Sequence, residues 1–334
     1  MSAIGAIVLD TWRQSRQQAV FVVLGVVSLA LCIGASLAVG TRTGSDGEDH
    51  IVLFGAEESS DLLESFWNGL YVASVTSEPA GTNEGSSGFV DSAGDTLPAL
   101  TLSAREQAMM AGSSVPAIQR GAEVYAYWTA NILYTLSMWL FIIACSGYFP
   151  AMLEGGAIDM VLAKPLRRWK IYLGKYLGGL GLFSMLMLIS YSLVFLGLGF
   201  RSGVWVFGVL AVLPLQIMVA ALLYAMIAVF GVHTRSPLLS TVVGLALYIV
   251  VDTGMGALLA AQKSGVFARM GWGGLDKIAE LYPILMPNFT LLKEQALLST
   301  LNVPLMTWPP FATAFVWIVA SLGLGCWRFS RTDY

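Results

Sequence analysis

The sequence predicts an all-α polytopic membrane protein with six transmembrane helices. Of its 334 residues, 56% are hydrophobic and only 12% are charged, whereas soluble domains carry roughly 25% charged residues. The mean hydropathy of the chain is +0.72. A helical span needs about 20 consecutive apolar residues to cross a bilayer. Six stretches meet this requirement, at residues 19–40, 126–148, 174–200, 205–232, 238–260 and 309–327.

The first apolar stretch, 19–40, is predicted to be a retained span. It is longer than the apolar region of a signal peptide, which is usually about 7–15 residues. Ahead of it, residues 1–18 are expected to form an interfacial helix on the cytoplasmic side. The apolar residues that recur there at helical spacing are Ile4, Ile7, Val8 and Trp12.

Charge asymmetry predicts the orientation of the chain. If the N-terminus is cytoplasmic and six spans alternate, ten of the 18 Lys and Arg residues fall on the cytoplasmic side, together with only four acids. Cytoplasmic loops of membrane proteins are enriched in Lys and Arg. We therefore expect both termini in the cytoplasm.

Two outer segments follow from this topology. Residues 41–124 are expected to form a long acidic loop with short helices between spans one and two. Residues 125–334 then form a five-span membrane domain that includes a second outer segment at 261–308. Pro283 and Pro287 break any helix there, so we expect this segment to lie on the surface or to re-enter the membrane in part.

The segment 150–172, between spans two and three, predicts a cytoplasmic helix–break–helix elbow. Pro165 interrupts one helix and suits the first position of the next, where its missing N–H is not needed. The residue before a proline is also driven out of the helical region. The segment carries four cations in a chain where charge is scarce: Lys164, Arg167, Arg168 and Lys170. A basic surface of this kind is suited to receive a partner.

The sequence offers little support for an enzyme. The chain has no Gly-x-x-x-x-Gly-Lys-Ser/Thr phosphate loop and therefore does not bind ATP by that route. Its two histidines, His50 and His233, are expected on opposite sides of the membrane, which argues against a zinc protease or an intramembrane Ser–His pair. The cysteines all fall within spans and indicate packing. We expect no catalytic, cofactor-binding or metal-binding residue in this chain.

Two polar residues within the apolar stretches are candidates for a translocation path. Asp252 lies in the fifth stretch, and intramembrane carboxylates usually face a cavity or a partner. Its distance from the cytoplasmic end also allows a position at the outer interface, so both interpretations stay open. Gln216 lies close to Pro214 in the fourth stretch. A kink beside a polar side chain is common in transporters, although packing alone tolerates it.

Taken in order, these features resemble the permease subunits of ABC-2-type ABC transporters. In that family an acidic residue, glycine, a small helix, a proline with basic residues and a Gly-Lys pair lie between spans two and three. The residues of this chain that match the pattern are Glu154, Gly155, Gly156, Ile158 to Ala163, Lys164, Pro165, Arg167, Arg168, Gly174 and Lys175.

The resemblance implies transport driven by ATP hydrolysis on a separate ABC ATPase subunit. ATP and Mg²⁺ would then be bound by that partner and no cofactor by this chain. The elbow residues matched above would couple to the ATPase. The resemblance also implies a complex with a second permease, identical or different, in the lipid bilayer of a bacterial cytoplasmic (inner) membrane. We expect export of an unidentified substrate and no nucleic-acid partner.

A non-transporting membrane scaffold is the alternative that the sequence leaves open. The acidic loop 41–124 would then serve as a docking surface for partner proteins. An ATPase that co-purifies with the chain would distinguish the transporter from the scaffold.

Overall fold

The computed structural model describes six stretches of the chain and a few isolated residues. These are residues 19–43, 49–56, 116–153, 167–263, 286–301 and 308–331, with the single residues 59, 62, 63, 65 and 269. The expected interfacial helix at 1–18, most of the loop 41–124, the elbow residues 154–166 and much of the segment 261–308 lie outside the described residues.

The described part of the chain is mostly helical and contains six long helices, one over each of the predicted apolar stretches. Their bounds are α2 (Ala19–Ala38), α5 (Ala117–Ser146), α8 (Arg168–Ser202), α9 (Gly208–Thr234), α10 (Pro237–Lys263) and α14 (Pro309–Arg331). A short helix, α6 (Tyr148–Leu153), follows α5 directly.

Four of these segments are long and apolar enough to cross a membrane. They are α5 continued by α6, then α8, α9 and α14. The apolar parts of α2 and α10 are shorter, at Val22–Ala38 and Pro237–Ile249. The described residues therefore support four spans, and the topology with six spans stays a prediction.

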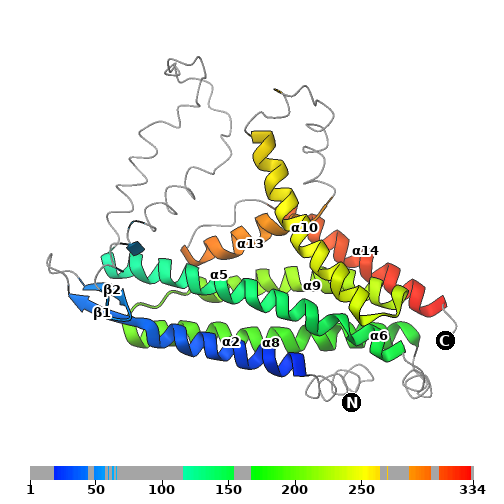
Figure 1. The fold of residues 1–334 in the computed structure, drawn as a ribbon, viewed down its shortest axis with the longest axis horizontal. Helices are drawn as coiled ribbons and strands as arrows, with labels where there is room; N and C mark the ends of the chain where they lie inside the picture. Colours follow the sequence, from blue (N-terminus) through cyan, green and yellow to red (C-terminus); the bar gives the residue numbers. More distant parts are fainter. Residues whose placement is uncertain are drawn as a thin grey trace.

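Helix α9 lies at the centre of the bundle. Its sequence is apolar on all sides, which is typical of a helix surrounded by other helices. In the most apolar 18-residue stretch of α9, 67% of the residues are buried, whereas 22% are buried in the corresponding stretch of α14. Helix α14 is therefore peripheral. Helix α9 contacts α5, α8, α10, α13 and α14. Figure 1 shows α2, α5, α8 and α9 side by side along the long axis, with α10 and α14 crossing them obliquely.

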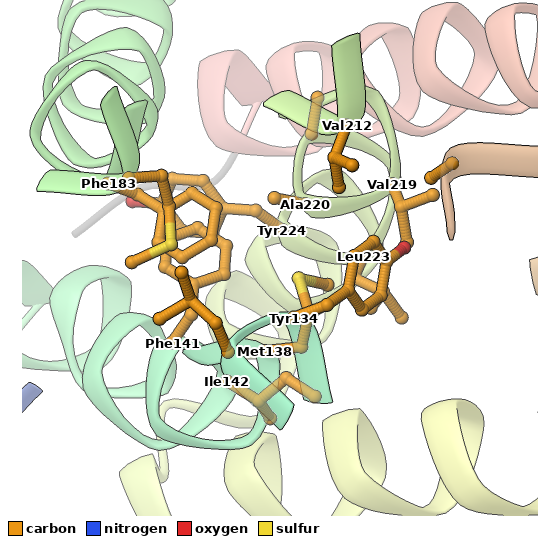
Figure 2. Close-up of a cluster of buried hydrophobic side chains, with 14 of the residues drawn as sticks. Tyr134, Met138, Phe141, Ile142, Phe183, Val212, Val219, Ala220, Leu223 and Tyr224 are labelled. Atoms are coloured by element: carbon orange, nitrogen blue, oxygen red, sulfur yellow. The ribbon is translucent and has the colours of Figure 1, made fainter. Parts of the chain in front are cut away.

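The centre of the core is built by α5, α8 and α9 (Figure 2). Phe141 of α5 lies between Phe183 and Tyr224, with ring centroids 4.2 Å and 5.7 Å away. All three rings are fully buried. Because lipid tails are as apolar as these side chains, close packing rather than transfer from water is what holds such helices together.

At one end of the bundle, which we call the hairpin end, α2 runs directly into a two-stranded antiparallel hairpin. The hairpin consists of β1 (Val39–Thr43) and β2 (Asp49–Leu53), and Val39 is paired with Leu53. The end of span one and the start of the outer loop were predicted here, and the two strands were not predicted. Each strand has five residues and no long alternating pattern, which is the signal by which strands are recognised.

Helices α5 and α8 hold the hairpin, which would be marginally stable by itself. Ile51 packs so closely on α5 that a Cβ added at Gly121 would lie 3.2 Å from the Ile51 Cβ. The guanidinium Nε of Arg201, near the end of α8, donates a 2.6 Å hydrogen bond to the Val39 carbonyl. Helix α5 reaches the hairpin because it begins at Ala117, before the predicted start of span two at residue 126.

The segment between α10 and α14 contains a short helix that the sequence analysis did not predict, α13 (Phe289–Leu298), continued by the 3₁₀ turn η1 (Ser299–Leu301). It begins just after Pro287, with the Asn288 side chain accepting a hydrogen bond from the Leu291 N–H at 3.0 Å. This is a helix N-cap. Helix α13 packs on α5, α9 and α10, so this part of the predicted outer segment is fixed to the bundle.

At the opposite end of the bundle, which we call the elbow end, α6, the start of α8 and the ends of α9 and α14 meet (Figure 1). Helix α2 begins on this side and α14 ends there (Figure 1). A left-handed cap at Arg235 (φ 54°) ends α9 at this end of the bundle, and another at Gly203 (φ 73°) ends α8 at the hairpin end. At each cap the chain turns back. The first and last described helices thus have their outer termini on one side of the bundle.

Candidate functional site

The candidate site is the elbow between α6 and α8, together with the helix ends on which it rests. Five of its predicted residues lie outside the described part of the chain: Glu154, Gly155, Gly156, Lys164 and Pro165. Arg167, Arg168 and Lys175 are described and can be placed.

Arg167 marks the second joint of the elbow. It has an extended backbone (φ −66°, ψ 133°) and directly precedes the first residue of α8, so the helix starts abruptly after it. A side chain that is exposed and outside the helix is free to meet another molecule. Arg167 is exposed, whereas Arg168 is half-buried and Lys175 is buried, with 5% of its surface accessible. Of the predicted coupling cations that the structure describes, Arg167 is therefore the one presented at the surface.

The cations at this point do not serve to stabilise α8. Its first turn contains Arg168 and Lys170 and no acid, and no side chain caps its N-terminus. The positive end of the helix dipole disfavours cations there, by about 0.3–1 kcal/mol for each exposed charge at low salt. The Lys170 ammonium lies 5.6 Å from the centroid of the Trp169 ring, a cation–π contact that offsets part of this cost.

The second limb of the elbow, the start of α8, contacts the C-terminal end of α14, and the first limb, α6, reaches α14 through α8. The guanidinium of Arg168 donates a long hydrogen bond of 3.5 Å to the carbonyl of Ser330. The ring of Tyr172, one turn further along α8, lies 4.8 Å from Phe149 of α6 and 6.1 Å from Phe329 of α14. Three helices thus meet at one aromatic side chain.

The first limb also contacts α9 and α10. The Phe149 ring lies 6.0 Å from Tyr224 of α9, and a Cβ added at Gly231 of α9 would lie 3.2 Å from Pro150. The hydroxyls of Ser146 and Thr241 form a 2.6 Å hydrogen bond that joins the end of α5 to the start of α10. Because α6 contacts both α9 and α10, a displacement of α6 would be transmitted to these two helices.

Sequence reasoning missed these aromatic contacts. Tyr148 was placed at the end of span two and Tyr172 in the elbow segment, and neither they nor Phe149 were assigned a contact. The available signal was their position, because large buried aromatic side chains stand immediately before and after a segment that is otherwise charged. Which rings touch is a property of helix packing and is not encoded in their spacing.

Gln216 joins three helices in the middle of the bundle. It is fully buried. Its amide Nε2 donates to the Ser137 hydroxyl of α5 at 2.7 Å, and its Oε1 accepts from the Tyr191 hydroxyl of α8 at 2.7 Å. Ser137 in turn donates to the Tyr134 carbonyl at 3.0 Å. In this conformation the side chain forms a tie between helices.

The other candidate for the translocation path, Asp252, belongs to α10, whose backbone runs from Pro237 to Lys263. The side chain of Asp252 lies outside the described part of the chain. Along the helix axis its backbone is about 22 Å from Pro237, at about 1.5 Å per residue, less than the roughly 30 Å of a hydrocarbon core. The prediction that Asp252 and Gln216 line a path stays a prediction.

Helices of this length and apolarity define a multi-pass membrane protein. A family model described as ABC-2 family transporter protein matches residues 6–334. The chain therefore belongs to the ABC-2 transporter family, and it is a membrane transport component, a permease. No curated protein and no solved structure gave a significant match.

Proposed function

We propose that this permease exports a substrate across the cytoplasmic membrane, driven by a separate ATPase that docks on the elbow. The observation that carries the proposal is the contact of Tyr172 with Phe149 and Phe329. The elbow is not an isolated loop, since a push on either limb is delivered to α14 through this ring. A permease that lacks a phosphate loop must receive work from outside, and this joint offers a route.

The exposed cations support the same proposal. Arg167 stands outside the helix, and the neighbouring charges oppose the dipole of α8. An acidic patch on a docking ATPase would compensate for that cost. Work is transmitted only if the bound and free states of the ATPase differ in their contacts with the elbow.

The test is co-purification of the tagged permease from its native membrane, with identification of the partners by mass spectrometry. We expect an ABC ATPase to be recovered with the wild type. Replacing Glu154, Arg167 and Arg168 with Ala should reduce that recovery or uncouple ATP hydrolysis from transport, while insertion into the membrane stays normal.

A matched pair of single substitutions sharpens the test. Arg167→Glu reverses an exposed charge at the elbow end, and Arg42→Glu reverses an exposed charge on β1 at the hairpin end. We expect at least tenfold less ATPase with Arg167→Glu and normal recovery with Arg42→Glu. Equal recovery with both variants, at equal expression, would refute docking at the elbow and would favour the scaffold alternative if no ATPase appeared at all.

A further inference from the structure

Two buried tyrosines that contact α6 have hydroxyls without a hydrogen-bond partner among the described residues. Tyr172 of α8 and Tyr224 of α9 are both fully buried, and their hydroxyl oxygens are unpaired. Buried polar groups nearly always have a partner, and leaving one without any costs free energy. Phe would fill the same space without that cost, so packing in this conformation does not account for the two hydroxyls.

Each hydroxyl lies against a glycine of a neighbouring helix. A Cβ added at Gly325 of α14 would overlap the Tyr172 hydroxyl, and one added at Gly179 of α8 would lie 2.8 Å from the Tyr224 hydroxyl. The hydroxyls thus occupy gaps left by missing side chains, and no hydrogen-bond acceptor receives them there.

The hydroxyl of a third tyrosine in the same cluster does have a hydrogen-bond partner. Tyr176 stacks on Tyr224 with ring centroids 5.1 Å apart, and its hydroxyl donates to the Ala221 carbonyl of α9 at 2.8 Å. Backbone carbonyls of the helices are therefore within reach of tyrosines in this bundle. Because residues of a helix follow one another at a rise of about 1.5 Å, a small sliding or rotation changes which carbonyl a hydroxyl meets.

The two tyrosines without a partner are also the ones that contact the elbow. The Phe149 ring of α6 lies 4.8 Å from Tyr172 and 6.0 Å from Tyr224. A displacement of α6 would therefore move both rings relative to the glycines that now face their hydroxyls. Interfaces between packed helices tend to have discrete arrangements rather than continuous ones.

We propose that the hydroxyls of Tyr172 and Tyr224 act in a second conformation of the permease, in which displacement of the elbow supplies them with backbone acceptors. In the conformation described here the two hydroxyls are unpaired. In the second conformation, reached when the elbow is displaced, each hydroxyl forms a hydrogen bond. This inference rests on the proposed function, because the elbow is taken to be displaced by the ATPase. The two tyrosines are positioning residues that bias the equilibrium between the states.

The first test uses the purified permease alone, without nucleotide, and compares Tyr172→Phe, Tyr224→Phe and the control Tyr176→Phe. The first two remove an unpaired hydroxyl and should raise the apparent melting temperature by about 2 °C or more each, while the control removes a hydrogen bond and should lower it. A lower melting temperature for Tyr172→Phe and Tyr224→Phe would mean that their hydroxyls are already bonded, which would overturn the inference whatever the ATPase does.

The second test uses the permease in complex with its co-purified ATPase, with and without ATP plus vanadate. Vanadate trapping should stabilise the wild type more than Tyr172→Phe or Tyr224→Phe, by about 2 °C or more, while the gain for Tyr176→Phe should match that of the wild type. A purely structural role would shift both states equally, and equal gains for all variants would overturn the inference. If no ATPase co-purifies, the proposed function and this inference fail together, and the co-purification records that outcome separately.

Discussion

Gln216 of α9 and Tyr191 of α8 form a 2.7 Å hydrogen bond in the interior of the bundle. The bond lies close in sequence to Pro214, which interrupts the hydrogen-bond ladder of α9 because proline has no N–H to donate. The same amide binds Ser137 of α5. Helix α9 is thus hydrogen-bonded to two of its neighbours, α5 and α8, close to the position where proline interrupts its own hydrogen bonds.

We expect Gln216→Leu to lower the stability of the permease by about 0.5–2 kcal/mol. The substitution leaves the buried Tyr191 hydroxyl without its acceptor, and bonds of this kind within membranes are worth roughly 0.6 kcal/mol on average. The double variant Gln216→Leu, Tyr191→Phe should regain part of the loss, because it removes the group left without an acceptor. Thermal unfolding of the purified proteins measures both, and a silent Gln216→Leu would contradict the tie.

Two glycines of α14 provide a matched pair of substitutions. A Cβ at Gly325 would overlap the Tyr172 hydroxyl, whereas a Cβ at Gly323 would meet nothing within 4 Å. We expect Gly325→Ala to destabilise the protein by about 1–3 kcal/mol through overpacking. Gly323→Ala should be neutral or stabilising, because Ala favours helix over Gly by about 1 kcal/mol.

The same pair can be combined with Tyr172→Phe in a double-mutant cycle. Removing the hydroxyl should restore only part of the stability lost in Gly325→Ala, because the ring Cζ would still lie 2.5 Å from the added Cβ, and it should have no such effect on Gly323→Ala. The coupling energy from thermal unfolding measures the contact. Strictly additive effects in the Gly325 cycle would mean that α14 and α8 are not packed as described.

Single cysteines test the orientation of the two ends, in a background where Cys32, Cys145 and Cys326 are replaced. Thr41→Cys lies on the exposed face of the hairpin, and His233→Cys lies exposed at the end of α9. We expect a membrane-impermeant thiol reagent to label Thr41→Cys in intact cells and His233→Cys only after the membrane is opened. Ser87→Cys and Ser103→Cys, in the predicted outer loop, should label like Thr41→Cys. The reverse pattern would overturn the predicted topology.

A pair of carbodiimides decides between the two interpretations of Asp252. If α10 begins at the cytoplasmic boundary of the membrane, as predicted, the backbone of Asp252 lies about 22 Å along the helix, within the roughly 30 Å of the hydrocarbon core, where a carboxyl group reacts with a lipid-soluble carbodiimide. We expect the lipid-soluble reagent to modify the wild type at residue 252 and the water-soluble reagent to leave it unmodified. Mass spectrometry of the labelled peptide provides the readout, with Asp252→Asn as the unreactive control. Modification by the water-soluble reagent alone would assign Asp252 to the outer interface.

Much of the architecture could be predicted because membrane helices leave a local signal. A helix that crosses lipid must be apolar along its whole length, so the stretches that predicted spans coincide with α2, α5, α8, α9, α10 and α14. A break before α8 was also predicted, because proline disfavours a helical conformation at the residue that precedes it. Pro165 lies outside the described residues, and the break there stays a prediction. Helix α8 begins at Arg168, so Pro165 is not the first residue of that helix.

The hairpin, α13 and the aromatic contacts were decided only by the tertiary structure. The two short strands are held by Ile51 against Gly121 and by Arg201 against the Val39 carbonyl, contacts between residues far apart in sequence. In the same way, nothing local distinguishes Tyr172, whose hydroxyl is unpaired, from Tyr176, whose hydroxyl binds Ala221. The sequence alone determined which segments are apolar and therefore helical, because that depends on local composition. Which polar group meets which partner depends on the rotation and offset of packed helices, and only the folded bundle sets these.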